Sequence, residues 1–196
     1  LFAASKLGLT TSRVQVPLSH VAIDGEEIPI PLQGKVTEGK GWVLRNSKGQ
    51  YTLTLDGLKA GSLERKTPAL EIQGDLTLVL KKGTESELLS ADAALKKGAG
   101  TLTIRGEGSL RLQGETALEG EWKEETLNQD EPSALRIEGG KLVFTGEETA
   151  LYEDTVELAG GEIQIQCLNG KGTGIRAHTL DDRHFSGSLE MEESEE

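Results

Sequence analysis

The chain has 196 residues, and its 33 acidic and 21 basic side chains give a formal net charge of −12 at pH 7. This surplus of negative charge repels phosphate backbones and anionic lipid headgroups, so it argues against binding to nucleic acid or to a membrane surface. No apolar run reaches the roughly 18 residues that a membrane span requires, so we expect no membrane insertion. With only two Trp, two Tyr and three Phe, the core must be filled by Leu, Ile and Val.

Residues 1–50 are expected to form an irregular N-terminal cap. The opening stretch, LFAASKLGL, lacks the basic leading segment of an export signal. Short alternating segments at 14–16, 21–23 and 28–30 read as strands, but nearby prolines confine such strands to edges or irregular pieces. Asp24-Gly25 predicts a hairpin turn between two of these segments. The cap would cover the first coil of a stack, since a bare end pairs readily with other chains.

From residue 51 onward the chain repeats one strand-and-turn unit. Five copies carry apolar side chains at their second and fourth positions and glycine at their sixth, and they begin at Thr52, Ala69, Thr101, Ala134 and Thr155. A smaller repeat of the Thr-Ala-Leu type follows at 116–118, 149–151 and 173–175. Together the repeats predict coils with three faces, with glycine at corners where the backbone needs positive φ.

The repetition predicts an all-β fold, namely a single-stranded right-handed parallel β-helix (β-solenoid) of about five coils over residues 51–185. The polar segments 81–100 and 120–133 lengthen the spacing between copies and are interpreted as insertions, the first with room for one or two helical turns. An antiparallel β-sandwich is the alternative, because it also has many short strands with glycine turns. We favour the solenoid because the copies share side-chain identity. Residues 186–196 are expected to be a solvated acidic tail.

Several stretches carry a family resemblance: Tyr51-Thr52-Leu53-Thr54-Leu55-Asp56-Gly57, Gly74-Asp75-Leu76-Thr77-Leu78, Gly100-Thr101-Leu102-Thr103-Ile104 and Gly172-Thr173-Gly174-Ile175. Over roughly residues 20–180 the chain resembles bacterial surface proteins that contain a carbohydrate-binding domain, which are short parallel β-helices of the pectate-lyase-like class. The resemblance implies an extracellular or cell-surface location and, as partner, a polysaccharide or a protein at a cell surface. The chain differs from this family in its longer acidic insertions and in having fewer Asn and Ser.

Exposed aromatic rings are the side chains that sugar binding would use, because a planar ring stacks on the face of a pyranose. Trp122, within a polar insertion, is the first candidate, followed by Trp42 and Tyr152. The alternative for Trp122 is that it folds back as the hydrophobic anchor of its own loop.

Catalytic candidates are fewer. Asp181-Asp182-Arg183-His184 places two carboxylates beside an imidazole, as acid–base hydrolysis needs. Four adjacent residues cannot all face one cleft, so we favour a polar turn. Calcium-assisted lyase chemistry would need acids from neighbouring coils plus a base, and the residues placed for it are Asp56, Asp75, Glu71, Arg105 and Arg136.

Metal and thiol chemistry are not expected. His20, His178 and His184 lack the spacing of a zinc site, so no metal ligand is assigned. Cys167 has no partner for a disulfide, and we interpret it as a buried structural thiol.

The sequence thus favours a non-enzymatic module, secreted or at the cell surface, that binds polysaccharide or serves adhesion. Two alternatives stay open: a β-helix polysaccharide lyase or hydrolase, and a purely structural stalk segment. No cofactor is expected, with calcium as the one that remains open.

Overall fold

The computed structural model describes residues 15–122 and 133–193. It contains 19 strands in two sheets, one of eight strands and one of eleven. No helix occurs in these residues, so none is long and apolar enough to cross a membrane. The LFAASKLGL stretch lies outside the described residues.

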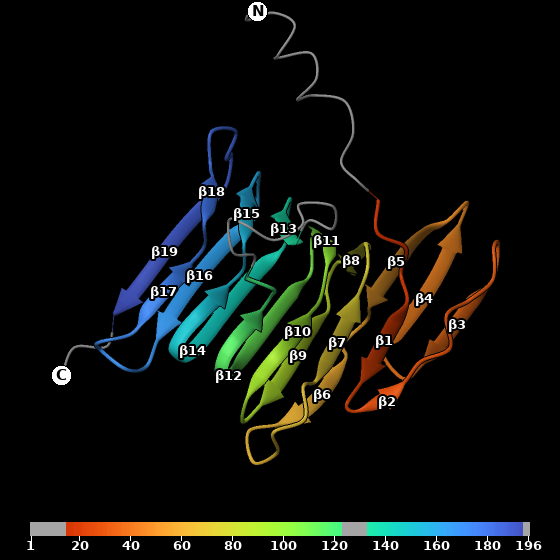
Figure 1. Cartoon of the computed structure of the whole chain (residues 1–196), viewed down its shortest axis with the longest axis horizontal. Helices are drawn as coiled ribbons and strands as arrows, with labels where there is room; N and C mark the ends of the chain where they lie inside the picture. The colour runs from red at the N-terminus through yellow and green to blue at the C-terminus, as the bar shows by residue number, and fades with distance from the viewer. Residues whose placement is uncertain (1–14, 123–132, 194–196) are drawn as a thin grey trace, which may run out of the picture.

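The chain winds into coils, and each complete coil contributes a strand to each of three faces (Figure 1). The first face is the parallel part of the eight-stranded sheet. Its strands, in stacking order, are β5 (Gln50–Leu55), β8 (Leu76–Leu80), β11 (Gly100–Gly106), β13 (Ser133–Ile137), β15 (Thr155–Leu158) and β18 (Thr179–Asp181).

The eleven-stranded sheet supplies the other two faces. The second face consists of β6 (Lys59–Ser62), β9 (Glu85–Ser90), the first halves of β12 (Ser109–Glu119) and β14 (Lys141–Tyr152), β16 (Glu162–Cys167) and β19 (Ser188–Glu193). The third face consists of β7 (Leu70–Gln73), β10 (Ala93–Lys97), the second halves of β12 and β14, and β17 (Thr173–Arg176). The predicted three-faced β-solenoid of about five coils is therefore confirmed.

Aliphatic ladders between the faces hold the coils together. Equivalent positions of successive coils pair in register, so that one leucine lies over the next, as in the row Leu76, Leu102, Leu135 and Val156. These side chains are 0–2 % exposed. Because fully burying a Leu or Val contributes about 1.5–3 kcal/mol, the ladders are the main source of stability.

One of the five predicted copies lies on a different face. Leu70, in the copy that begins at Ala69, pairs with Leu95 on the third face, and Leu76 occupies the place over Leu102 that was expected for Leu70. The copies predict that their second residues, Leu70, Leu102 and Leu135, lie over one another, and this is wrong for Leu70. All three faces share the same alternation of apolar and polar residues, so the pattern alone does not tell which face a strand joins.

Residues 81–100 are not an insertion and contain no helical turn. They form β9 and β10, which complete an ordinary coil. Thr52 pairs with Thr77 and Thr77 with Thr103, so this coil has nearly the same length as the coil before it. Ser86 and Ser90 face inward, at 3 % and 0 % exposed, and Ser86 pairs with a leucine, Leu110, of the next coil. The hydroxyl of Ser86 accepts a hydrogen bond from Leu58 N at 3.1 Å, which satisfies a buried donor and disguises the strand in the sequence.

The interval between Leu102 and Leu135 does contain extra chain. Residues 102 and 135 pair directly although β12 and a further connection separate them. Most of the predicted insertion 120–133 falls on residues 123–132, which lie outside the described part of the chain.

The N-terminal region covers the first coil with antiparallel strands. β1 (His20–Ile23) pairs with β7 and with β2 (Glu26–Glu27), and the predicted hairpin turn is confirmed by positive φ at Asp24 (51°) and Gly25 (81°). β3 (Val36–Gly39) and β4 (Trp42–Ser47) extend the eight-stranded sheet beyond β5. The described residues of 14–16 and 28–30 are not strands, in keeping with their neighbouring prolines.

The expected acidic tail is largely a strand. β19 pairs with β16 along its whole length, and Gln164 and Gln166 donate hydrogen bonds to Glu192 at 3.0 and 3.1 Å. Leu189 and Met191 alternate with glutamates, which is a strand pattern that the high charge concealed. Residues 194–196 lie outside the described part.

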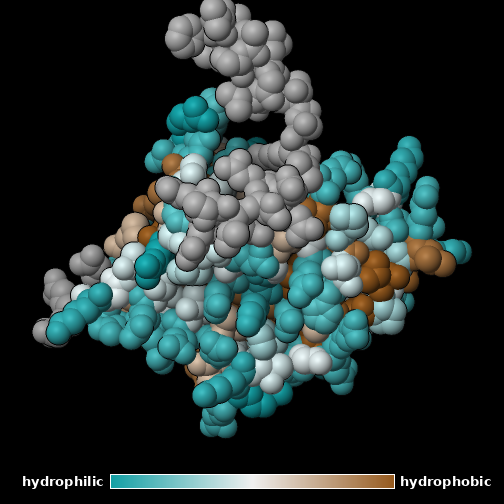
Figure 2. All heavy atoms as spheres, viewed as in Figure 1, coloured by the Kyte–Doolittle hydropathy of each residue, from teal (hydrophilic) through white to brown (hydrophobic). Residues whose placement is uncertain are grey.

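Outward positions on the strands carry mainly Glu, Gln, Arg, Lys and Thr, and the face seen in Figure 2 is accordingly hydrophilic over most of its area. The larger exposed apolar side chains occur in small separate groups. No broad apolar surface in this view calls for a covering partner.

Candidate functional site

Three ring-bearing side chains and one arginine gather at the corner where the third face turns back into the first. Trp122 follows β12, Tyr152 ends β14, Arg176 ends β17 and His178 precedes β18. The rings of Trp122 and Tyr152 stack with centroids 5.1 Å apart, and the ring of His178 lies tilted 3.5 Å from that of Trp122. We call Trp122, Tyr152, Arg176 and His178 the aromatic cluster.

The register of the third face builds this cluster. The predicted Thr-Ala-Leu repeat is confirmed, because Leu118 pairs with Leu151 and Leu151 with Ile175. The next position along each strand faces outward, which makes Tyr152 and Arg176 neighbours. The guanidinium of Arg176 lies 5.6 Å from the ring centre of Trp122 and 5.8 Å from that of Tyr152, a cation–π arrangement.

Polar atoms border the rings. Nδ1 of His178 shares a short hydrogen bond with the carboxylate of Asp154, in the turn after β14, and the backbone N–H of His178 donates to Asp154 O at 3.0 Å. Trp122 and Tyr152 are half-buried, whereas Arg176 and His178 are exposed. The corner therefore gathers aromatic rings beside a guanidinium and a carboxylate, the kinds of group that contact the apolar face and the hydroxyls of a sugar.

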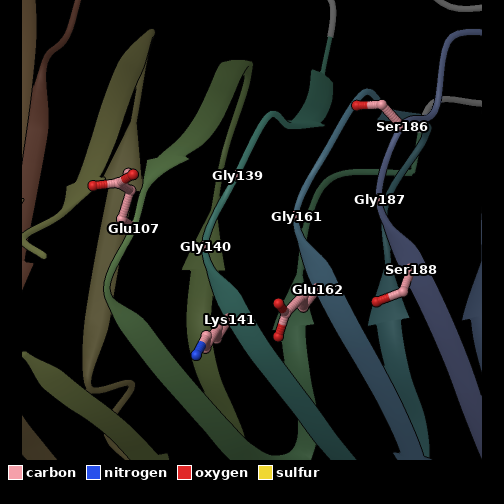
Figure 3. Close-up of a pocket in the computed structure, with 10 residues that line it drawn as sticks. Glu107, Gly139, Gly140, Lys141, Gly161, Glu162, Ser186, Gly187 and Ser188 are labelled. Carbon is pink, nitrogen blue, oxygen red and sulfur yellow. The ribbon is translucent and has the colours of Figure 1, made fainter. Parts of the chain in front are cut away.

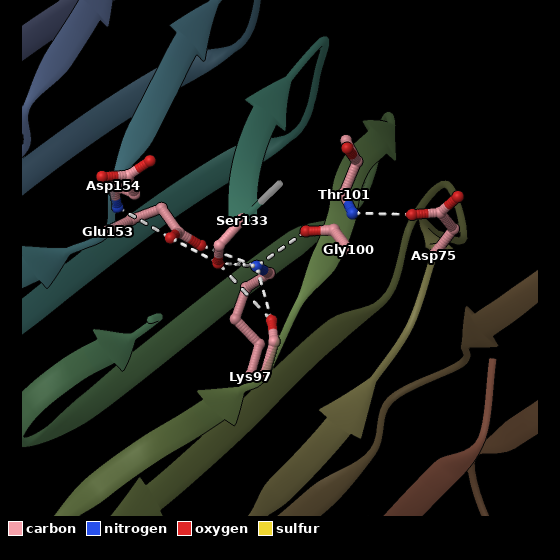
Figure 4. A network of polar contacts seen from close by, with 8 residues as sticks. Asp75, Lys97, Gly100, Thr101, Ser133, Glu153 and Asp154 are labelled. Atoms are coloured by element: carbon pink, nitrogen blue, oxygen red, sulfur yellow. Dashed lines mark hydrogen bonds and ion pairs between the residues drawn. The ribbon is translucent and has the colours of Figure 1, made fainter. Parts of the chain in front are cut away.

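A buried ion pair lies under this corner (Figure 4). Lys97 Nζ is 2.7 Å from Glu153 Oε2, and the two side chains are 1 % and 0 % exposed. Lys97 also donates to Ser133 Oγ and to the carbonyls of Gly100 and Gly98, at 2.9, 2.9 and 3.0 Å. We call Lys97, Ser133 and Glu153 the buried polar network.

The network joins the segments that carry the cluster. Glu153 Oε1 accepts hydrogen bonds from Ser133 Oγ and from Asp154 N, both at 2.7 Å. Glu153 thus ties the start of β13 to the turn that presents Asp154. A Cβ on Gly120 would lie 2.3 Å from the Glu153 carboxyl group, so a side chain at that position would displace the carboxylate.

Burial governs the charge state of the network. Desolvation raises the pKa of Glu153 and lowers the pKa of Lys97, against the attraction between the two groups. Each charge is therefore held by its partner, and removing one partner leaves the other buried and uncompensated.

A hollow of ≈ 530 Å³ lies at a different corner, where the first face turns into the second (Figure 3). Glycines of successive coils, among them Gly140, Gly161 and Gly187, form its wall. Its backbone donors already bond between coils, since Glu162 N donates to Gly140 O at 2.8 Å and Ser188 N to Gly161 O at 3.0 Å. This corner is a site of close backbone packing, and its lining also includes the side chains of Glu107, Lys141, Glu162, Ser186 and Ser188.

The catalytic candidates Asp181, Asp182 and His184 lie in and after β18. Asp181 accepts two hydrogen bonds from the guanidinium of Arg183, at 2.9 and 2.8 Å, and this pairing lowers the pKa of Asp181 to about 2. Asp182 and His184 are exposed in the turn that follows. On the coil before, Glu157 is the cross-strand neighbour of Asp181, and it forms an ion pair with Arg136.

The remaining candidates are spread over the molecule. Trp42 is 9 % exposed and packs in the core, so its ring is not presented to a ligand. Cys167 is buried and free, as interpreted from the sequence.

Of the residues considered for calcium, Asp75 and Arg105 line one groove, whereas Asp56, Glu71 and Arg136 have partners elsewhere. Asp56 pairs with Lys81 at 3.0 Å, Arg136 pairs with Glu138 and Glu157, and Glu71 lies near His20. No group of three or more His, Cys, Asp or Glu side chains is placed to hold a metal ion in the residues that the structure describes.

The stacked coils define a β-solenoid, and the aromatic cluster lies at one corner of its surface. The chain belongs to the family of carbohydrate-binding domain-containing proteins, which matches residues 19–194. Comparison with curated proteins and with solved structures found no match.

Proposed function

We propose that the chain is a polysaccharide-binding module without enzymatic activity, and that the aromatic cluster is its sugar-contacting surface. The observation that carries this proposal is the stacking of Trp122 and Tyr152 next to Arg176 and Asp154 at one corner. Membership of the carbohydrate-binding family supports the ligand class.

The arrangement of acids supports binding in preference to hydrolysis. Glycoside hydrolysis uses two carboxyl groups on either side of the scissile bond, one of them protonated at working pH. Asp181 is held ionised by Arg183, and Asp182 and His184 share its turn. We also propose a location outside the cell or on its surface, because polysaccharides occur there. Surface labelling of intact cells with an antibody tests this location.

The test is binding of the protein to an immobilised glycan panel and to gels that contain soluble polysaccharides. Trp122→Ala and Tyr152→Ala should each weaken binding at least tenfold, which corresponds to about 1.4 kcal/mol. Leu63→Ala serves as the control, because Leu63 is an exposed apolar residue at 45 % on another part of the surface.

Each result bears on one part of the proposal. A parent protein that binds no glycan overturns the function. Unchanged affinity of Trp122→Ala overturns the site, and a lowered melting temperature with unchanged affinity would assign Trp122 to anchoring its own loop.

A further inference from the structure

A second surface of the molecule has the properties of a binding site and is separate from the aromatic cluster. A groove of ≈ 700 Å³ crosses the outer side of the first face at its N-terminal end. Its floor holds Thr52, Thr77, Thr101 and Thr103, and residues 15–18 and 48–51 rim it. We call this the threonine groove.

Strand register places the threonines in a row. Thr52 pairs with Thr77 and Thr77 with Thr103, in parallel strands β5, β8 and β11. Each alternates with a buried leucine, so all three hydroxyls point outward and are half-exposed. Neighbouring strands are about 4.8 Å apart, so the row offers evenly spaced hydroxyl groups along a groove.

Three cations border the groove, and its two arginines form no ion pair with any described residue. Arg105 lines it, Lys48 lies on its rim, and Arg45 is the cross-strand neighbour of Thr52. Arg45 and Arg105 have neither a carboxylate nor a ring as partner, unlike the other described arginines, which are Arg65, Arg111, Arg136, Arg176 and Arg183. Unpaired guanidinium groups are unexpected in a chain with a net charge of −12.

One acidic residue, Asp75, lines the groove against these three cations. Asp75 accepts hydrogen bonds from Thr101 N at 2.8 Å and from Val16 N at 3.1 Å, so both of its carboxylate oxygens are engaged by the backbone. At the far end of the row, Arg136 pairs with Glu157 and Glu138. The unpaired cations are thereby confined to the N-terminal half of the first face.

We infer that the threonine groove binds an anionic polysaccharide. Arg45 and Arg105 would each donate a forked pair of hydrogen bonds to a carboxylate or sulfate group, and the threonine row would bind sugar hydroxyls. The two arginines lie three strand spacings apart across the sheet, about 14 Å, and are offset by two residues, about 7 Å, along the strands. This separation matches charged groups on different sugar units of one chain. This site does not depend on the aromatic cluster.

The test uses one backbone with three charge states: dextran, carboxymethyl dextran and dextran sulfate. The wild-type protein should bind at least one charged form and not neutral dextran, and whichever form it binds identifies carboxylate or sulfate as the group recognised. The Arg45→Gln/Arg105→Gln double variant should lose at least tenfold in affinity. Raising NaCl to about 1 M, where the Debye length is about 3 Å, should weaken wild-type binding similarly.

Matched controls separate this site from general electrostatics and from the first proposal. Arg111→Gln removes an exposed arginine from the second face and should leave binding unchanged. Thr77→Val keeps the branched shape and should weaken binding several-fold, since Val79 shows that valine fits this surface. The Arg45→Gln/Arg105→Gln double variant should keep any binding to neutral glycans, because Arg45 and Arg105 lie outside the aromatic cluster.

Three results would overturn the inference: no binding of either charged dextran, equal binding of neutral dextran, or a loss in Arg111→Gln equal to that of the double variant. Melting temperatures of all variants report whether the fold is intact.

Discussion

Lys97 and Glu153 are the two charged side chains that are fully buried among the described residues. A buried ion pair gains attraction but loses the hydration of both ions, so its net effect on stability is small even when its geometry is good. The energetic weight lies in the consequence of breaking it. The position of Glu153 between Tyr152 and Asp154 makes the pair a support for the aromatic cluster as well.

Lys97→Met should lower the free energy of unfolding by about 3–5 kcal/mol, because Glu153 would stay buried without a counter-charge. Glu153→Leu should cost a similar amount for the matching reason. The double variant should lose much less than the sum of the two, since no unpaired charge remains. Urea denaturation of the four proteins measures this cycle, and additive losses would contradict it.

The two residues of the cluster that the sequence predicted are those whose chemistry marks them. Trp122 and Tyr152 are recognisable as ring-bearing side chains without knowledge of the fold. Arg176 and His178 could not be found in that way, because their role depends on the register that pairs Tyr152 with Arg176. Lys97 and Glu153 are 56 positions apart in the sequence, and only the folded chain makes them partners.

At the level of strands, the sequence predicted some features correctly and missed others. Alternation and corner glycines predicted parallel stacking, three faces and the hairpin at Asp24-Gly25. They did not assign β7 to its face, because the alternation is the same on every face. Ser86 and Ser90 inside β9, and glutamates along β19, hid two further strands behind polar composition.

Removal of residues 188–196, which deletes β19, should lower the free energy of unfolding by about 1–3 kcal/mol. The estimate follows from partial burial of Leu189 and Met191, which are 37 % and 55 % exposed, against a full value of about 1.5–3 kcal/mol each. A chain shortened by residues 194–196 alone is the control. A melting midpoint that is the same in both shortened chains would contradict a packed β19.

The whole molecule is a stack in which each coil pairs mainly with the coils before and after it. Stability in such a stack is a sum of coil terms and nearest-neighbour terms, so the middle coils are held from both sides. The two ends differ: antiparallel strands β1 to β4 cover the first coil, whereas β18 and β19 are edge strands (Figure 1).

Backbone amides should therefore exchange most slowly in β11 to β14 and progressively faster toward β18 and β19. The N-terminal coil should be better protected than the C-terminal one because of its cover. Hydrogen–deuterium exchange followed by mass spectrometry of peptides measures this gradient. Equal protection of all coils would mean that the solenoid opens only as a single unit.

The even spacing of Thr52, Thr77 and Thr103 turns the first face into a molecular ruler. Duplicating residues 76–101, the coil that begins at Leu76 and ends before its register partner Leu102, would add one rung. The face would lengthen by about 4.8 Å while both ends of the stack stay as they are. A protein family built in this way can match the reach of its surface to longer targets by copying a segment, without inventing a new fold.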